Sequence, residues 1–267
     1  MTDVFGSDAY APAEIAARVR DVGVAKARLP LLTQGLLGML AGAFIGLGSL
    51  LFTLVHSDAT LGFAASRLLS GLAFSLGLVL VSVAGAELFT GNNLIAMAWA
   101  SGQVSTLEVL RNWALVALAN LAGASALALL VWLSGHGALN GGAVARAAVR
   151  IALTKAELPW TEAFFRGVLC NVLVCMAVWM SFAGRSVVDK AVAIVFPITA
   201  FVAAGFEHSV ANMYFFPLAM LLGAPLGLRE MVGNLLPVVA GNIVGGSVLV
   251  ALVYWLIYLR RPGVHRP

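Results

Sequence analysis

Charged residues are unusually scarce in this sequence. Only 10% of its 267 residues are Asp, Glu, Lys or Arg, whereas 61% are hydrophobic. A soluble domain carries about 25% charged residues, because its surface must present groups that water solvates. The low charge therefore excludes a soluble enzyme, a nucleic-acid-binding protein and a secreted domain, and it predicts an integral membrane protein.

Cysteines and catalytic signatures are also scarce. Cys170 and Cys175 lie within one apolar run and match neither a metal-binding spacing nor a redox motif. The sequence contains no G-x-S-x-G or H-E-x-x-H motif, so nothing in it favours an intramembrane enzyme. We therefore expect no enzymatic activity, no metal and no cofactor.

Apolar runs long enough to cross a bilayer, which takes about 20 residues, divide the chain. They predict an N-terminal segment (1–30) with a short interfacial helix at 12–27, a transmembrane domain (31–258) and a tail (259–267). Shorter apolar stretches near 93–100 and 209–222 follow polar clusters, so we expect the second and fifth helices to be broken. The six runs cover residues 33–55, 66–86, 112–134, 163–182, 191–206 and 232–258.

Lys and Arg residues indicate how the chain is oriented. With six spans both termini lie on one side, and that side carries 10 of these residues against 6 on the other. Basic residues accumulate on the cytoplasmic side of membrane proteins. Both termini are therefore predicted to be cytoplasmic.

The two halves of the chain resemble each other. Residues 84–92 and 204–212 both fit A-G-x-E-x4-N, 120 residues apart, and NLAGAS at 120–125 is echoed by NIVGGS at 242–247. Each half (about 31–135 and 160–258) holds three spans, so the second half is inverted relative to the first. Broken helices at corresponding positions of inverted repeats point to a substrate site near the membrane midplane.

Acidic residues inside the apolar segments are confined to these breaks. Glu87 and Glu207 are the acids there, and His208 is the histidine. Each carboxylate either stabilises the break by accepting hydrogen bonds from freed backbone N–H groups or contacts substrate. Asn92 and Asn212 are expected to have the same structural role at the breaks. An imidazole can donate to an anion and titrates near neutral pH, which favours a functional role for His208. Lys155 is either an interfacial anchor or part of a positive funnel that concentrates anions.

Three stretches resemble the formate/nitrite transporter family, over nearly the whole chain. They are GAELFTGN at 85–92, LCNVLVCMAVWM at 169–180 and GFEHSVANMY at 205–214. The segments GVAKA at 23–27 and FSLGL at 74–78 look most like the formate-channel branch. The resemblance implies an all-α, aquaporin-like fold of six helices, assembled as a homopentamer with one pore per subunit in the bacterial inner membrane.

The resemblance also implies the residues of the pathway. The family's central histidine falls on His208, and its flexible loop falls on Leu88, Phe89 and Thr90. The matches to its apolar constrictions, with the polar Asn171 nearby, are Phe74, Leu78, Leu88, Phe89 and Phe201. The matches to its polar network are Lys155, Glu207 and Asn242.

We expect a channel or transporter for small monovalent anions of weak acids, most of all formate, with pH-dependent gating or proton coupling at His208. Nitrite or hydrosulfide transport is the alternative within the family. A neutral-solute channel is a more distant alternative, since the sequence contains no Asn-Pro-Ala motif. The expected partners are the anion, membrane lipid and copies of the chain.

Overall fold

The computed structural model describes residues 9–260, so positions 1–8 of the predicted N-terminal segment and 261–267 of the predicted tail lie outside the described residues. Within 9–260, six helical segments are long and apolar enough to cross a membrane. Each begins two to six residues before the matching predicted span. In two of them, Thr106–Leu133 and Val187–Ala204, a serine caps the polar first turn (Ser105 and Ser186). The six are Leu31–His56, Phe63–Gly85, Thr106–Leu133, Trp160–Ser181, Val187–Ala204 and Leu228–Tyr258.

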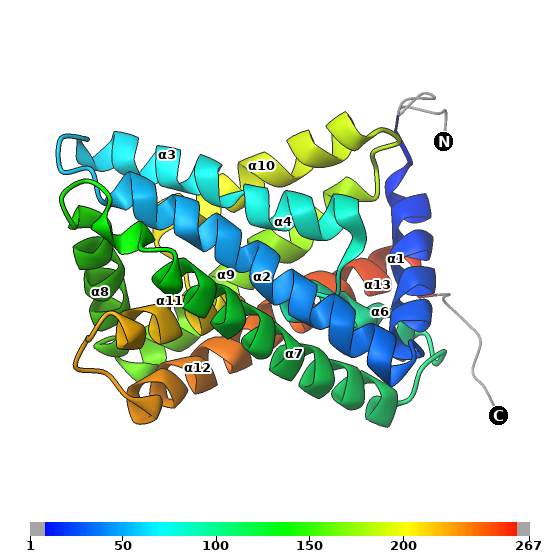
Figure 1. Ribbon diagram of the computed structural model, residues 1–267. Coiled ribbons are helices and arrows are strands. Elements are labelled where there is room, and N and C mark those ends of the chain that lie inside the picture. Colours follow the sequence, from blue (N-terminus) through cyan, green and yellow to red (C-terminus); the bar gives the residue numbers. More distant parts are fainter. Residues whose placement is uncertain (1–8, 261–267) are drawn as a thin grey trace.

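The two halves of the chain share one order of elements (Figure 1). A short helix comes first in each, then a span, a broken span and a third span. The first half consists of α1 (Pro12–Ala27), α2 (Leu31–His56), α3 (Phe63–Phe74), α4 (Leu76–Leu80), η1 (Val81–Gly85), α5 (Phe89–Asn92), η2 (Asn93–Ile95), α6 (Ala96–Ala100) and α7 (Thr106–Leu133). After η3 (His136–Ala138), the second half consists of α8 (Ala143–Ala156), α9 (Trp160–Ser181), α10 (Val187–Ala204), α11 (Ser209–Leu221), α12 (Leu228–Ile243), η4 (Val244–Leu252) and α13 (Val253–Tyr258).

Both predicted helix breaks are confirmed. The second span leaves helical geometry after Gly85 and becomes helical again at Phe89, and the fifth stops at Ala204 and resumes at Ser209. Two irregularities were not predicted: the second span ends in a π-helix, η1, and the sixth span is a π-helix over η4. A π-helical turn has no signature in hydropathy, because it changes the hydrogen-bond spacing and not the polarity of the residues.

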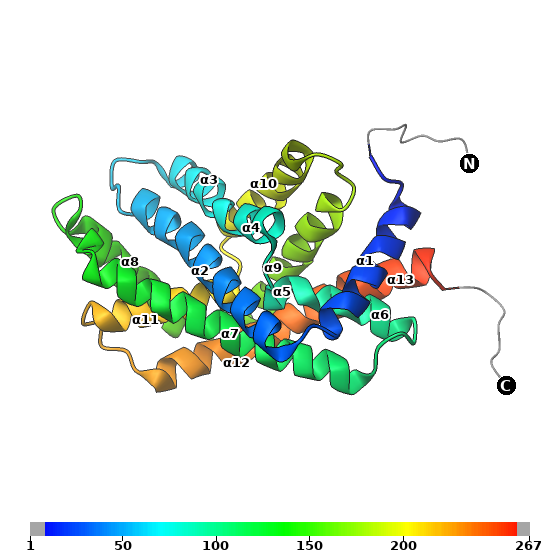
Figure 2. The ribbon, with the colours of Figure 1, turned by 45° about the vertical axis from the view of Figure 1, so that its right-hand side comes forward.

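Small residues bring the first and third spans of each half into close contact. α2 packs against α7, and α9 packs against α12 (Figure 2). A Cβ atom on Gly123 of α7 would overlap the carbonyl oxygen of Met39, and one on Gly241 of α12 would overlap that of Phe164. Membrane helices pack through such positions, because dispersion between close backbones replaces a hydrophobic force that lipid does not supply.

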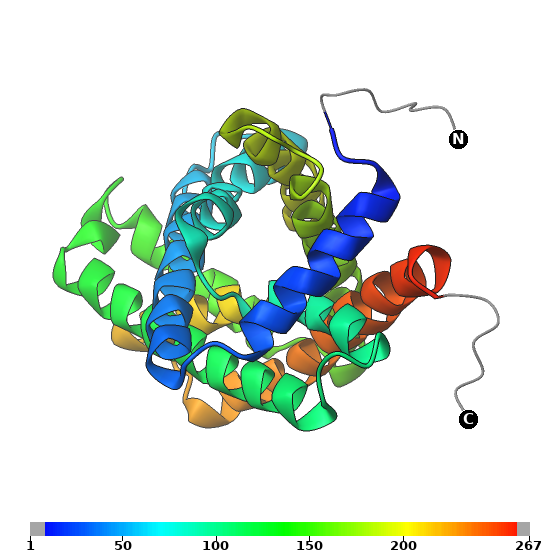
Figure 3. The same cartoon turned by 90° about the vertical axis from the view of Figure 1, so that its right-hand side faces the viewer.

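The spans surround a central axis, and α1 crosses one end of it (Figure 3). α1 packs on η2, α6 and α13, with Ile15, Ala16 and Val19 buried in that contact. Because α1 contacts α13, both ends of the described chain lie at the same end of the bundle. This arrangement follows from an even number of spans.

We predict that Gly241→Ala destabilises the protein, whereas Gly233→Ala on the same helix does not. The added methyl at position 241 meets a backbone carbonyl that no rotamer change can move, while position 233 has no atom within 4 Å. Overpacking of this kind costs about 1–3 kcal/mol. Thermal unfolding in detergent should show a lower Tm for Gly241→Ala alone, and equal Tm values for the two variants would contradict the packing described.

Candidate functional site

A glycine in the left-handed region ends the helix at each break. Gly85 has φ = 81° and Gly205 has φ = 78°, at equivalent positions of the two halves. Residues with a side chain rarely adopt this conformation, so glycine turns the backbone out of the helix at little cost. The chain is extended at Leu88 and at His208, and a new helix begins one residue later.

An asparagine from the third span holds the backbone of each break. Asn120 accepts a hydrogen bond from the Phe89 N–H at 2.9 Å and donates to the Glu87 carbonyl at 2.9 Å. In the second half, Asn242 accepts from the Ser209 N–H at 3.0 Å and donates to the Glu207 carbonyl at 3.1 Å. These bonds satisfy backbone groups that would otherwise be unpaired in a medium without water.

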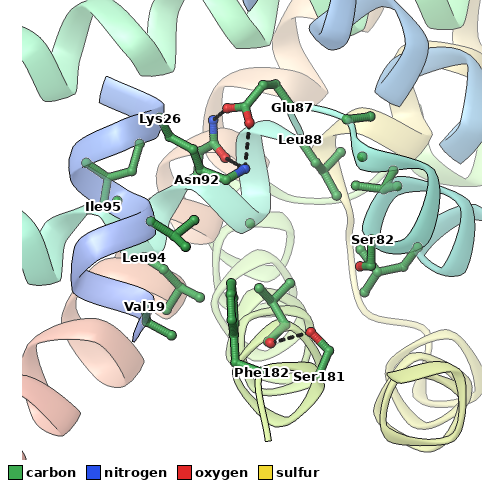
Figure 4. A pocket seen from close by; sticks show the side chains of 18 of the residues that line it. Val19, Lys26, Ser82, Glu87, Leu88, Asn92, Leu94, Ile95, Ser181 and Phe182 are labelled. Carbon is green, nitrogen blue, oxygen red and sulfur yellow. Dashed lines mark hydrogen bonds and ion pairs between the residues drawn. The ribbon is translucent and has the colours of Figure 1, made fainter. Parts of the chain in front are cut away.

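The carboxylate of the first break belongs to a closed ring of four polar side chains, which we call the Lys26 ring. Lys26 donates to Glu87 at 2.7 Å and to Asn92 at 3.0 Å (Figure 4). Asn92 donates to Glu87 at 2.7 Å and to Asn112 at 3.0 Å. Asn112 closes the ring by donating to the Lys26 carbonyl at 3.1 Å.

The second break repeats this arrangement in the Lys155 ring. Lys155 donates to the two Glu207 oxygens at 2.8 and 3.0 Å. Asn212 donates to Glu207 at 2.7 Å and to Asn234 at 2.7 Å, and Asn234 donates to the Lys155 carbonyl at 2.9 Å. Each lysine is the last residue but one of a short helix, α1 or α8, so these two helices serve equivalent positions in the two halves.

The breaks differ at the N-cap of the second helix, which is Leu88 in one half and His208 in the other. The Nδ1 atom of His208 accepts from the Ala211 N–H at 3.1 Å, and its Nε2 atom lies 3.0 Å from the hydroxyl of Thr90. A nitrogen that accepts from an amide carries no proton, so the neutral ring donates from Nε2 to Thr90. The Thr90 hydroxyl proton then remains available to another acceptor.

A cavity approaches this pair from each side within the described chain. The α1-side cavity, about 350 Å³, contains Lys26 and Glu87 and extends inward to Leu88 (Figure 4). Leu78 also lines it. The α8-side cavity, about 280 Å³, contains Lys155 and Glu207 and extends inward to His208 and to the residues Phe74 and Phe201. The rings of Phe201 and His208 stack with centroids 5.9 Å apart. Apolar side chains thus separate the two cavities next to His208.

Three residues expected on the pathway line neither of these cavities. Thr90 is fully buried and reaches the pathway through its hydrogen bond with His208. Phe89 is 2% exposed and packs in the hydrophobic core. Asn171 is fully buried, and its amide donates to Asn93 at 2.8 Å and to the Asn242 carbonyl at 2.7 Å. Asn171 therefore connects α9 to both halves of the molecule.

Comparisons with known proteins assign the family. The family model described as formate/nitrite transporter matches residues 13–256. The chain belongs to the formate/nitrite transporter family. Members of this family are channels and transporters and not enzymes, and the chain is accordingly a multi-pass membrane protein.

Curated relatives and solved structures of this family cover nearly the whole chain. The chain is 38% identical to the formate channel FocA of Escherichia coli K12 over 97% of its own length and 98% of that protein. It is 39% identical to an uncharacterised transporter, YrhG, of Bacillus subtilis, covering 94% of each. A pentameric formate channel with formate bound matches with a TM-score of 0.80 at 38% identity (86% of this chain, 98% of that one), and an FNT family ion channel matches with 0.84 at 32% (91% and 98%).

Sequence reasoning found the polar residues at the breaks, Glu87 and Asn92 in the first half and Glu207 and Asn212 in the second, but it missed several of their partners. The resemblance to the formate/nitrite transporter family suggested Lys155, Glu207 and Asn242 but not Lys26 or the two ring asparagines, Asn112 and Asn234. The repeat itself contained a signal: Asn112 precedes Asn120 by eight residues, as Asn234 precedes Asn242. Within residues 9–260, no cluster of three or more His, Cys, Asp or Glu is arranged to bind a metal.

We predict that Lys155→Gln destabilises the protein more than Lys26→Gln. Each change leaves a buried glutamate without its cation, which costs about 3–5 kcal/mol for a fully buried pair. The side chain of Lys155 is 15% exposed and that of Lys26 is 28% exposed, so water compensates Glu87 better than Glu207.

Thermal unfolding of the two variants tests this order. Adding Glu207→Gln to Lys155→Gln should recover part of the lost Tm, because the second change removes the unpaired charge. An unchanged or lower Tm in the double variant would show that Glu207 does not depend on the lysine for its compensation.

Proposed function

We propose that the protein is a channel of the bacterial inner membrane that conducts formate and other small monovalent anions of weak acids. The observation that carries this proposal is the hydrogen-bonded pair of Thr90 and His208, located between two cavities that apolar side chains separate. Two of the related proteins named above are described as formate channels, one of them with formate bound. Nitrite and hydrosulfide are the alternative substrates.

The geometry supports a passage in three steps. A lysine in each cavity attracts the anion, although the adjacent glutamate neutralises part of its charge. In the constriction the anion loses its water, which is costly for a bare charge. The Thr90 hydroxyl, oriented by the proton on Nε2 of His208, then donates to the anion.

A low dielectric favours the neutral acid over its anion. We therefore propose that formate takes a proton from cavity water at the constriction, crosses the apolar side chains as formic acid, and releases the proton in the opposite cavity. His208 makes this exchange depend on pH, because protonation of Nδ1 would break its hydrogen bond with Ala211. Apolar residues on both sides of the pair, Leu88 and Phe201 among them, keep bare ions out.

The protein is further proposed to assemble as a homopentamer with both termini in the cytoplasm. The exposed apolar surface of the spans suits contacts with lipid and with four further copies of the chain, as in the pentameric relative. Residues 1–30 and 259–267 are proposed to lie in the cytoplasm, flanking the transmembrane domain 31–258. The common end occupied by α1 and α13 supports one side for both termini.

Uptake of radiolabelled formate into proteoliposomes tests the proposed function. Uptake should be much faster than into empty liposomes, and an excess of nitrite or hydrosulfide should compete with it. Stopped-flow swelling in a glycerol gradient should stay at the rate of empty liposomes. Glycerol swelling without formate uptake would instead identify a neutral-solute channel.

We further predict that His208→Asn and Thr90→Val lower formate uptake about ten- to a hundredfold, which corresponds to losing a hydrogen bond of about 1.5–3 kcal/mol to a charged group. Asn still caps α11, so the first variant should fold while its uptake loses its dependence on pH. Thr90→Ser keeps the hydroxyl and serves as the matched control, with uptake close to wild type. Wild-type uptake and pH dependence in His208→Asn would refute the role of the pair.

A further inference from the structure

Arginines make the α8-side cavity more positive than the Lys155 ring requires. Arg67, Arg150 and Arg166 line this cavity in addition to Lys155, whereas no arginine lines the α1-side cavity within the described chain. Glu207 is the single acidic residue among the described residues that line the α8-side cavity. This carboxylate is already occupied by Lys155 at 2.8 Å.

The three arginines differ in how their charge is compensated. Arg166 pairs with Glu162 at 2.8 Å, and both side chains are well exposed. Arg67 donates from Nε to the Ala203 carbonyl at 2.8 Å, so its guanidinium lies against Gly205 at the helix break and has a neutral partner. Across residues 9–260, neither Arg67 nor Arg150 has a carboxylate within 4.0 Å. Two positive charges in one cavity are therefore left without an acidic partner.

Uncompensated like charges that share a cavity repel one another and raise the affinity for an anion between them. A concave, positively lined site with low-dielectric walls concentrates the field. Guanidinium groups bind carboxylates through two parallel hydrogen bonds, since their planar donors match the two oxygens. A molecule with two carboxylates would neutralise both charges, and a cavity of about 280 Å³ has room for several water-sized groups.

We propose that the α8-side cavity binds a small dicarboxylate dianion, of which oxalate is the simplest, between the guanidinium groups of Arg67 and Arg150. The bound dianion lies outside the constriction at His208. It does not pass, because two negative charges would have to enter the apolar side chains together. It therefore blocks the pathway from the α8 side. The binding site is independent of which anion is conducted, and only the block rests on the proposed function.

Isothermal titration of oxalate into the purified detergent-solubilised protein, at constant ionic strength set with chloride, measures the site directly. Arg150→Gln should weaken oxalate binding at least tenfold. Arg146→Gln is the matched control: Arg146 lies one turn earlier on α8 and is exposed, as Arg150 is, but it does not line the cavity. Its affinity should stay within twofold of wild type. No oxalate binding by the wild type, or equal losses in the two variants, would overturn the proposal.

Formate uptake in the presence of oxalate then separates this proposal from the proposed function. Oxalate on both sides of proteoliposomes should inhibit uptake by the wild type and by Arg146→Gln at concentrations that leave Arg150→Gln unaffected. If oxalate binding depends on Arg150 while the wild type takes up no formate, the site stands and the proposed function fails. If formate is conducted but inhibition by oxalate is the same in both variants, the block by a dianion held at Arg150 is refuted.

Discussion

Every feature of the pathway depends on one constraint, which is that a helix interrupted inside a membrane must find partners for its freed backbone groups. Lipid supplies none, and each unpaired group costs several kcal/mol. The chain meets this constraint with side chains, through Asn120 at one break and Asn242 at the other. With its backbone groups paired in this way, the break is stable as a short extended segment. The residues of that segment are then free to line a passage.

The same constraint explains why buried glutamates are present in so apolar a protein. Glu87 and Glu207 are each 4% exposed and would be unfavourable as isolated charges. Each accepts hydrogen bonds from a lysine and an asparagine, and both of these partners are fixed by a further asparagine. The lysine of each ring therefore affects the site in two ways. It makes the carboxylate tolerable, and because its own charge is largely cancelled, the positive field of the α8-side cavity comes mainly from its arginines.

Hydropathy and the internal repeat were sufficient to predict six spans, two breaks and the inverted relation of the halves. They worked because long apolar runs and the A-G-x-E-x4-N repeat are local properties of the sequence. The Lys26 ring was not predicted, because Lys26 lies 61 residues from Glu87 and only the packing of α1 brings them together. The π-helix of η4 and the burial of Phe89 were missed for a related reason: both depend on how neighbouring helices pack.

Two equivalent halves would by themselves give a passage with the same chemistry in each. In the first half, the N-cap residue of the helix after the break is Leu88, and in the second half it is His208. Capping α11 fixes the imidazole so that its Nε2 atom points to Thr90, a residue of the opposite half. The symmetric frame thus supplies two cavities and two neutralised carboxylates. Two differences between the halves, Leu88 against His208 and Thr90 against Val210, supply the polar centre. Because that centre includes a residue from each half, a shift of either helix break would disrupt the hydrogen bond between Thr90 and His208.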